Sequence, residues 1–148
     1  MELLLPRCTL RPWRADDAEA LALHANDREV WRNMRDAFPH PYTPELARAW
    51  LASVSSVRPV LFFAVDVGGQ AVGGIGVSPL QDVYRRSGEI GYWLARPFWN
   101  RGIVSEAVDA MTAYAFTTLG LVRLQTGVFA WNPASMRVLE KCGYAREG

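Results

Sequence analysis

The sequence predicts an α+β domain in which helices flank a mixed, largely antiparallel twisted sheet. Apolar residues recur at helical spacing in the first third of the chain and again over residues 102–143. Between these regions, residues 60–95 contain apolar and β-branched runs separated by turn signals, which is typical of strands. A chain of 148 residues, half of them hydrophobic, can bury one sizeable core, so we expect a single domain over residues 1–148.

The first third predicts one strand and two helices. Residues 8–11 form a short apolar strand, and the chain turns at Pro12 into a helix with acidic residues in its first turn, where the helix dipole favours them. A second helix begins with Thr43 as the N-cap and Pro44 at the first helical position. The proline-rich segment 36–44 before it is predicted to be a loop.

The middle of the chain predicts three strands. Residues 60–67 and 70–80 are joined by Gly68-Gly69, a two-residue hairpin turn. After the polar loop 81–87, the segment 88–95 supplies a third strand.

The strongest helical pattern follows, and Gly120 ends it. Its apolar positions fall on one face at steps of three and four: Val104, Val108, Met111, Ala115 and Leu119. Residues 121–130 then predict another strand, and residues 132–143 a short capped helix that stops at Gly143.

The start of the long helix predicts an anion site. Backbone N–H groups in the first turn of a helix are unpaired and carry the positive end of the dipole, and Gly102 allows close approach of a ligand. Arg101 and Ser105 would add a charge and a hydroxyl. The alternative interpretation is that Gly102 only starts the helix. The chain has no Walker-type phosphate loop, and Gly74 and Gly76 lack the third glycine of a dinucleotide fingerprint.

Composition narrows the class of protein further. The formal net charge of +1 gives no electrostatic reason to expect nucleic acid or an anionic membrane as a partner. The sequence has no membrane-length apolar run and no signal peptide, and Cys8 and Cys142 belong to no CxxC pair, which indicates reduced thiols in a cytoplasmic protein. His24 and His40 are isolated, so we expect no metal site.

The strings GEIGYWLARPFWNRGIVSEA and NPASMRVLEKCGY, together with the opening TLRPWRADDAEAL, resemble the GNAT N-acetyltransferase superfamily. Within it they are most similar to the branch of ribosomal-protein N-terminal acetyltransferases. The resemblance covers essentially the whole chain and implies that the anion is the pyrophosphate of acetyl-coenzyme A. It implies backbone contacts at Arg101, Gly102, Ile103 and Val104, with Ser105 as a side-chain donor. Val104 stands where the family usually has a small residue, so its side chain must point into the core.

The resemblance also implies a place for the pantetheine arm of the cofactor. In this fold the strand before the turn separates from the next strand, and the arm pairs with its free amides, here those of Tyr92, Trp93 and Leu94. Gly91 within that strand is interpreted as a β-bulge that starts the separation, or as a glycine needed only for close packing.

Two residues are candidates for the chemistry of acetyl transfer. Glu89 opens the cofactor strand and is a candidate general base, or alternatively a solvated carboxylate. Ser135 matches the family serine that protonates or orients the coenzyme sulfur, or is simply polar in the first turn of its helix. Asn132 caps that helix, and the resemblance adds a pantetheine contact. Cys142 is expected to pack in the core and not to act as a nucleophile.

The resulting hypothesis is an N-acetyltransferase that moves an acetyl group from acetyl-CoA to a primary amine, on a protein N-terminus or a small molecule. Segments 26–42 and 81–86 would shape the acceptor site, with Trp31 or Trp50 lining it. A coenzyme-A-binding sensor without turnover is the alternative. Family members usually continue into a closing hairpin where this sequence ends, so we expect a truncated chain or an edge supplied by a homodimer partner.

Overall fold

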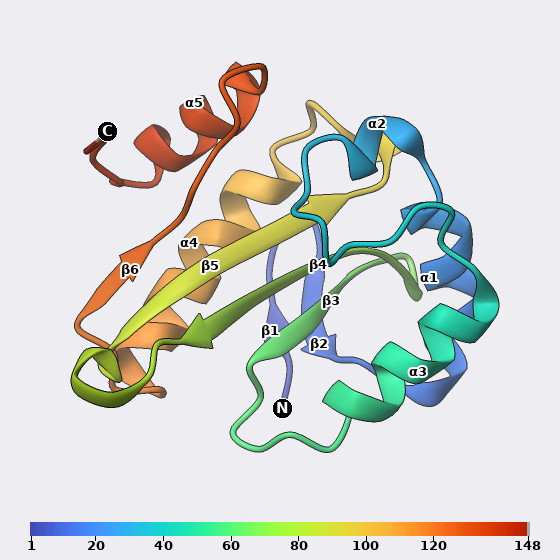
Figure 1. Ribbon diagram of the computed structural model, residues 1–148, viewed down its shortest axis with the longest axis horizontal. Coiled ribbons are helices and arrows are strands. Elements are labelled where there is room, and N and C mark those ends of the chain that lie inside the picture. Colours follow the sequence, from blue (N-terminus) through green and yellow to red (C-terminus); the bar gives the residue numbers. More distant parts are fainter. Residues whose placement is uncertain (148) are drawn as a thin grey trace.

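Six strands form one sheet in the order β1-β2-β3-β4-β5-β6, with helices on both of its faces (Figure 1). The computed structural model describes residues 1–147. The strands are β1 (Leu3–Leu4), β2 (Thr9–Pro12), β3 (Phe62–Val67), β4 (Gln70–Pro79), β5 (Ser87–Leu94) and β6 (Arg123–Gln125). The helices are α1 (Ala18–Ala25), α2 (Arg28–Trp31), α3 (Pro44–Val54), α4 (Ile103–Thr117) and α5 (Pro133–Lys141), with 3-10 turns η1 (Ala15–Asp17), η2 (Asp82–Tyr84) and η3 (Arg96–Phe98).

The direction of the strands confirms the predicted fold class. Each neighbouring pair from β1 to β5 is antiparallel, and β5 pairs with β6 in parallel, so the sheet is mixed. The predicted hairpin turn joins β3 to β4, and both of its glycines have positive φ. The predicted cap of α3 is also present, since the Leu46 amide donates to Thr43 Oγ1 at 3.2 Å.

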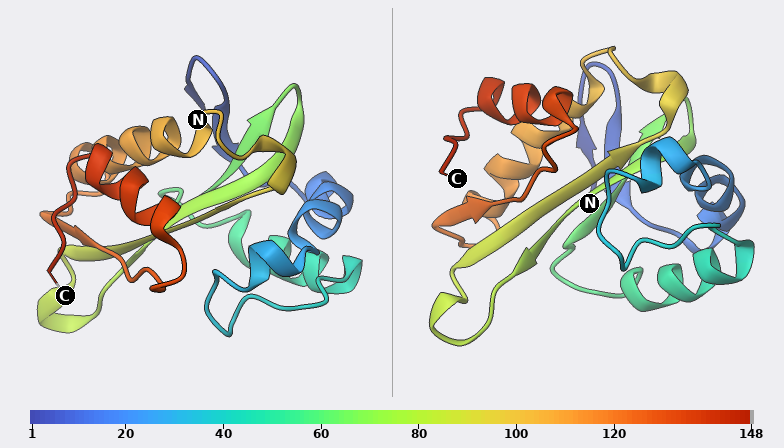
Figure 2. Two further views of the ribbon diagram at one scale, coloured as in Figure 1. Left: turned by 90° about the horizontal axis from the view of Figure 1, so that it is seen from above. Right: turned by 45° about the horizontal axis from the view of Figure 1, so that its top comes forward.

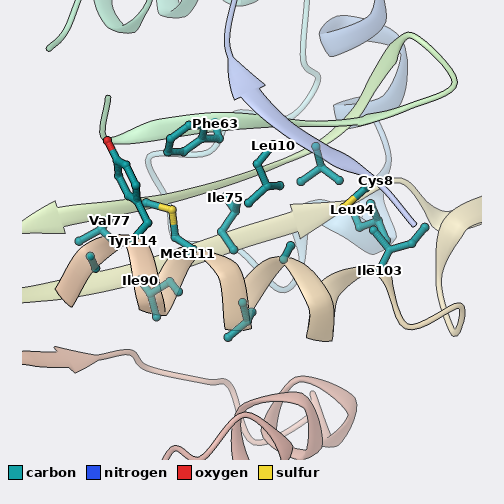
Figure 3. Packing of buried hydrophobic residues seen from close by; sticks show 14 of the residues in the cluster. Cys8, Leu10, Phe63, Ile75, Val77, Ile90, Leu94, Ile103, Met111 and Tyr114 are labelled. Atoms are coloured by element: carbon teal, nitrogen blue, oxygen red, sulfur yellow. The ribbon is translucent and has the colours of Figure 1, made fainter. Parts of the chain in front are cut away.

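One face of the sheet is covered by α4, and the other by α1 and α3 (Figure 2). The predicted stripe of α4 is the buried one, with Val108, Met111 and Ala115 fully enclosed. These side chains pack on inward-facing residues of β2 to β5, among them Leu10, Phe63 and Ile90 (Figure 3). Burial of this apolar surface is the main stabilising contribution on this side.

A buried ion network supports the opposite face. Arg11 on β2 donates through both terminal nitrogens to Asp17, at 2.8 and 2.9 Å, and through Nε to Asp66 at 2.7 Å. Burial alone would raise the pKa of Asp17, but the hydrogen bonds from Arg11 and from the Arg14 amide lower it. The network joins the start of the α1 segment to β2 and β3.

One prediction about local structure concerns Gly91 and is wrong. Gly91 is not a bulge, because β4 and β5 pair without interruption from Gly73↔Leu94 to Pro79↔Gly88. The register shift lies instead between β3 and β4, at Val65/Asp66. The alternative, a glycine needed for close packing, is wrong as well, because a Cβ added to Gly91 would meet nothing within 4 Å.

The strand predicted over residues 121–130 is regular only at β6. Its pairing with β5 ends at Glu89↔Gln125, and beyond this point the chain diverges from β5 and loses its hydrogen-bonding partner (Figure 1). Residues 144–147 form no strand, and Glu147 forms an ion pair with Arg123; residue 148 lies outside the described residues.

A cleft between β5 and β6

Strand β5 is paired along one edge and largely open along the other. Its edge toward β4 is paired from Gly88 to Leu94, whereas its edge toward β6 is paired only from Ser87 to Glu89. Beyond Glu89 the two strands separate, and α5 lies beyond the gap (Figure 1). An unpaired strand edge presents amide and carbonyl groups to any extended ligand that lies beside it.

The pairing pattern identifies which amides of β5 face the gap. The Ala95 amide donates to Val72 O at 2.8 Å, so residue 95 and every second residue before it bond to β4. The backbone of Trp93 therefore belongs to the ladder with β4, which corrects the expectation that its amide is free. The amides of Tyr92 and Leu94 point to the gap.

Side chains on β5 alternate between two environments. Ile90 and Leu94 are buried against α4, and Tyr92 lies on the same side. Glu89, Gly91 and Trp93 lie on the other face, where Trp93 packs with Phe38 at a centroid distance of 5.9 Å. Glu89 and Tyr92 thus approach the gap from opposite faces of the sheet.

The predicted turn before α4 has the backbone geometry of an anion site. Gly102 is the N-cap with φ 79° and ψ 4°, in the left-handed region, and no side chain of the described residues caps the helix. The first amide with a bond inside the helix is that of Glu106, which donates to Gly102 O at 3.2 Å. The amides of Ile103, Val104 and Ser105 consequently form the open end of the helix.

Side chains around this turn add two cations and place Val104 as required. Arg101 lies over the Phe98 ring at 5.4 Å, and Val104 packs partly buried against the core, as its departure from the family pattern demands. Arg7, between β1 and β2, reaches the same turn and pairs with Glu106 at 3.0 Å. Sequence reasoning missed Arg7 because it lies 99 positions from Glu106 and belongs to no local motif.

A single cleft of about 800 Å³ brings the predicted site residues together, a size within the usual range of small-molecule sites. Its lining includes all eleven of them: Glu89, Tyr92, Trp93, Leu94, Arg101, Gly102, Ile103, Val104, Ser105, Asn132 and Ser135. Several residues of segment 26–42 line the cleft, as expected. None of residues 81–86 lines it, so the expectation that segment 81–86 shapes the acceptor site is wrong. Trp50 lines it; Trp31 does not, and stacks on His40 instead.

A hydrogen bond joins β5 to α5 across the gap. The hydroxyl groups of Tyr92 and Ser135 are hydrogen-bonded, with 2.5 Å between the two oxygens. Burial raises the pKa of Tyr92, partly opposed by the bond to Ser135, so the phenol stays protonated at neutral pH. Asn132 Oδ1 accepts from the Ser135 amide at 3.4 Å, which confirms its role as a cap.

Glu89 forms an ion pair that sequence reasoning missed. Arg35, from the segment between α2 and α3, places Nη1 2.6 Å from Glu89 Oε1. A second contact joins the same segment to the chain before α5, since the Trp131 indole donates to the Arg32 carbonyl at 3.3 Å. These contacts connect the segments on either side of the gap.

Both cysteine thiols have a raised pKa, which disfavours a nucleophilic role. The Cys142 thiol donates to Ser105 O at 3.4 Å, and burial, followed by the charge of Asp109, raises its pKa to about 11. Burial and Glu106 raise the pKa of Cys8 to about 11 as well. Within residues 1–147, no group of three or more His, Cys, Asp or Glu side chains is placed to hold a metal ion, and no helix is both long and apolar enough to cross a membrane.

Solved structures with the same architecture define the class of protein. An acetyltransferase of the GNAT family from Bacillus anthracis superposes with a TM-score of 0.86 at 26% identity, covering 100% of this chain and 86% of that one. Mycobacterium smegmatis RimJ in complex with CoA-disulfide superposes with a TM-score of 0.83 at 23% identity, covering 95% of this chain and 71% of that one. Ribosomal-protein-S5-alanine acetyltransferase from Vibrio fischeri superposes with a TM-score of 0.83 at 22% identity, covering 100% of this chain and 85% of that one. The mixed, split sheet is the fold of an acetyltransferase.

The chain belongs to the GNAT acetyltransferase family, whose domain model, described as "Acetyltransferase (GNAT) domain", matches residues 7–145. The uncharacterized N-acetyltransferase p20 of Bacillus licheniformis is 30% identical over 161 residues, 99% of this chain and 83% of that protein. The uncharacterized N-acetyltransferase YoaA of Bacillus subtilis is 39% identical over 79 residues, 53% of this chain and 44% of its own length.

Proposed function

We propose that this protein is an acetyl-CoA-dependent N-acetyltransferase that acts on a primary amine. The observation that carries the proposal is the convergence of the unpaired edge of β5, the open N-terminus of α4 and the carboxylate of Glu89 on one cleft. Likeness to a RimJ solved with CoA-disulfide and to a ribosomal-protein acetyltransferase supports a place in that branch, with a protein N-terminus as one acceptor class.

The residues present fit acetyl-CoA as the co-substrate. The open first turn of α4, with Arg101, Ser105 and the nearby Arg7, offers donors and positive charge to a pyrophosphate. The amides of Tyr92 and Leu94 offer strand-like pairing to a pantetheine arm, and Asn132 lies at the same cleft. When bound, acetyl-CoA supplies an activated thioester carbonyl.

The chain would supply positioning and proton transfer. Fixing the two reactants in one cleft removes much of the entropic cost of their encounter. Glu89 would take a proton from the acceptor ammonium, directly or through water, and so produce the neutral amine that attacks. Ser135, hydrogen-bonded to the protonated Tyr92, would orient or protonate the leaving sulfur.

The first test is binding followed by turnover. Acetyl-CoA is expected to raise the melting temperature and to bind in calorimetry, because a ligand of the native state stabilises it. Thiol release with a panel of amines and N-terminal peptides then measures transfer. Absence of binding at millimolar acetyl-CoA would contradict the proposal, and binding with no release for any acceptor would favour the sensor alternative.

The role of Glu89 is tested by Glu89→Gln. We expect kcat to fall by about 10²–10⁴-fold with little change in acetyl-CoA affinity, since a general base contributes in that range. Glu45→Gln is the matched control, because Glu45 is an exposed carboxylate on α3 that also pairs with an arginine. An unchanged rate across the pH range would remove Glu89 from the mechanism.

A further inference from the structure

Opposite charges meet at one point on the acceptor side of the cleft. The Arg35 guanidinium contacts the Glu89 carboxylate, with 66% of the arginine side chain and 29% of the glutamate side chain exposed. A Cβ added to Gly127 would lie 3.6 Å from Arg35 Nη2, so the guanidinium lies between β5 and the chain after β6. Both members of this pair remain reachable by a ligand in the cleft.

The charges of the cleft disfavour a polycationic acceptor. Among the described residues that line it, Glu89 is the only acidic one, against four cations: Arg35, Arg101, Arg137 and Lys141. Arg101 is assigned above to the pyrophosphate of the cofactor, so beside Glu89 a polyamine would find one carboxylate, which Arg35 already pairs, and the like charge of Arg35 itself. An acceptor with an anionic group beside its amine would find a partner for each charge.

An apolar space lies next to Glu89, and no side chain fills it at Gly91. On this face of the sheet Gly74 pairs with Trp93, Gly76 with Gly91, and Ser78 with Glu89. Side chains of Trp93 and Phe62 cover Gly74 and Gly76, but a Cβ on Gly91 would meet nothing within 4 Å. Gly91 therefore leaves a gap between the Glu89 carboxylate and the aromatic rings of Trp93 and Phe62. This gap explains why the position is a glycine, since the strand has no bulge there.

We propose, building on the function proposed above, that the acceptor is a free α-amino acid with a large apolar or aromatic side chain. Its ammonium group takes the place of Arg35 at Glu89, its carboxylate binds the Arg35 guanidinium, and its side chain lies over Gly91 against Trp93 and Phe62. Arg35 is then a specificity-determining residue that reads the carboxylate beside the amine.

The transfer balances with acetyl-CoA as the acyl donor. The ammonium loses one proton to Glu89, which passes it to solvent, and the amine nitrogen attacks the thioester carbonyl. A nitrogen–carbon bond forms and the carbon–sulfur bond breaks. The second proton leaves the nitrogen, and the thiolate gains one, so the products are the N-acetyl amino acid, the free thiol of coenzyme A and one proton.

The test compares acceptors that differ only in the carboxylate: phenylalanine, phenylalaninamide and phenethylamine, with spermidine and a tripeptide added. At saturating acetyl-CoA, kcat/KM for phenylalanine is expected to exceed that for phenethylamine by about tenfold or more, the range for a charge-assisted pair. Arg35→Gln should bring this ratio close to one, and Arg35→Lys should restore part of it. Arg48→Gln, which alters an exposed, glutamate-paired arginine outside the cleft, should leave the ratio unchanged.

The outcomes separate this inference from the function on which it rests. Equal or better turnover of phenethylamine, spermidine or the tripeptide overturns the amino-acid acceptor while leaving N-acetyltransfer intact. An unchanged phenylalanine-to-phenethylamine ratio in Arg35→Gln overturns the role of Arg35. Failure to bind acetyl-CoA, measured separately by calorimetry, overturns the proposed function itself.

Discussion

The two faces of the sheet are built differently. On the α4 face, aliphatic side chains interlock until Leu10, Val108 and Met111 have no accessible surface (Figure 3). On the face toward α1 and α3, aromatic rings pack among alanines, a Cβ added to Gly91 would meet nothing within 4 Å, and the buried Trp13 Nε1 has no hydrogen-bond partner within the described residues.

This difference separates stability from ligand binding. Close packing on the α4 face holds β5 in place, and that lets its other face and its free edge remain incompletely filled. A binding cleft needs such unfilled space. The following variants test that division, in order of the expected effect.

Arg11→Met should give the largest loss of stability. It leaves Asp17 and Asp66 without their buried partner, and breaking such a pair costs about 3–5 kcal/mol. Arg14→Met, which removes only an exposed contact with Asp16, is the control and should shift unfolding by less than about 0.5 kcal/mol. Denaturant unfolding of both variants is the measurement.

The same network predicts the sign of a pH effect. Because the pKa of Asp17 is lowered in the folded state, its contribution to stability is fully present above the unfolded pKa of about 4 and is lost as pH falls toward the folded value. The gap between wild type and Arg11→Met should therefore narrow below about pH 4. A gap that widens on acidification would contradict this assignment.

Met111→Ala removes packing from the closed face. Met111 is fully buried in the core, so its truncation to alanine should lower the free energy of unfolding by about 2–5 kcal/mol. At a temperature where the variant is folded, its affinity for acetyl-CoA should match wild type. A large loss of affinity in the folded variant would mean that the two faces are not separable.

Gly102→Ala acts at the turn into α4. A residue with a Cβ is strained at this left-handed φ, so the free energy of unfolding should fall by about 1–2 kcal/mol. The added carbon itself meets nothing closer than Arg7 at 3.5 Å. Acetyl-CoA affinity is expected to fall as well, as measured by calorimetry. Unaltered affinity would argue that the turn does not bind the pyrophosphate.

Gly91→Ala should have the smallest effect on stability, within about 0.5 kcal/mol, because nothing surrounds the added carbon. It is the matched partner of Gly102→Ala, since both glycines are exposed and only Gly102 has a left-handed φ. We expect a raised KM for the acceptor and unchanged acetyl-CoA affinity. The reverse pattern would place Gly91 on the cofactor side.

Local signals predicted much of the fold, because their causes are local. The cap at Thr43 and the stripe of α4 depend on residues a few positions apart, and both are confirmed. The early end of β6 depends instead on where its partner strand diverges. No local pattern in residues 121–130 records that event.

The site divides in the same way. The start of the long helix indicated the Gly102 turn, the opening of the cofactor strand indicated Glu89, and a family motif indicated Ser135; all three line one cleft as expected. These signals could not reveal Arg35 or Arg7, whose partners lie 54 and 99 positions away. Such pairs form only when loops are placed by the whole fold, so the charge around the carboxylate had to come from the structure.

The Cys142 thiol, bonded to Ser105 O beside the first turn of α4, bears on side reactions during turnover. With a pKa of about 11, only about one molecule in 10⁴ carries the thiolate at pH 7. Thiol–disulfide exchange and capture of an acyl group both require that anion. Cys142 therefore has little tendency to exchange with a disulfide or to take up an acyl group from a thioester.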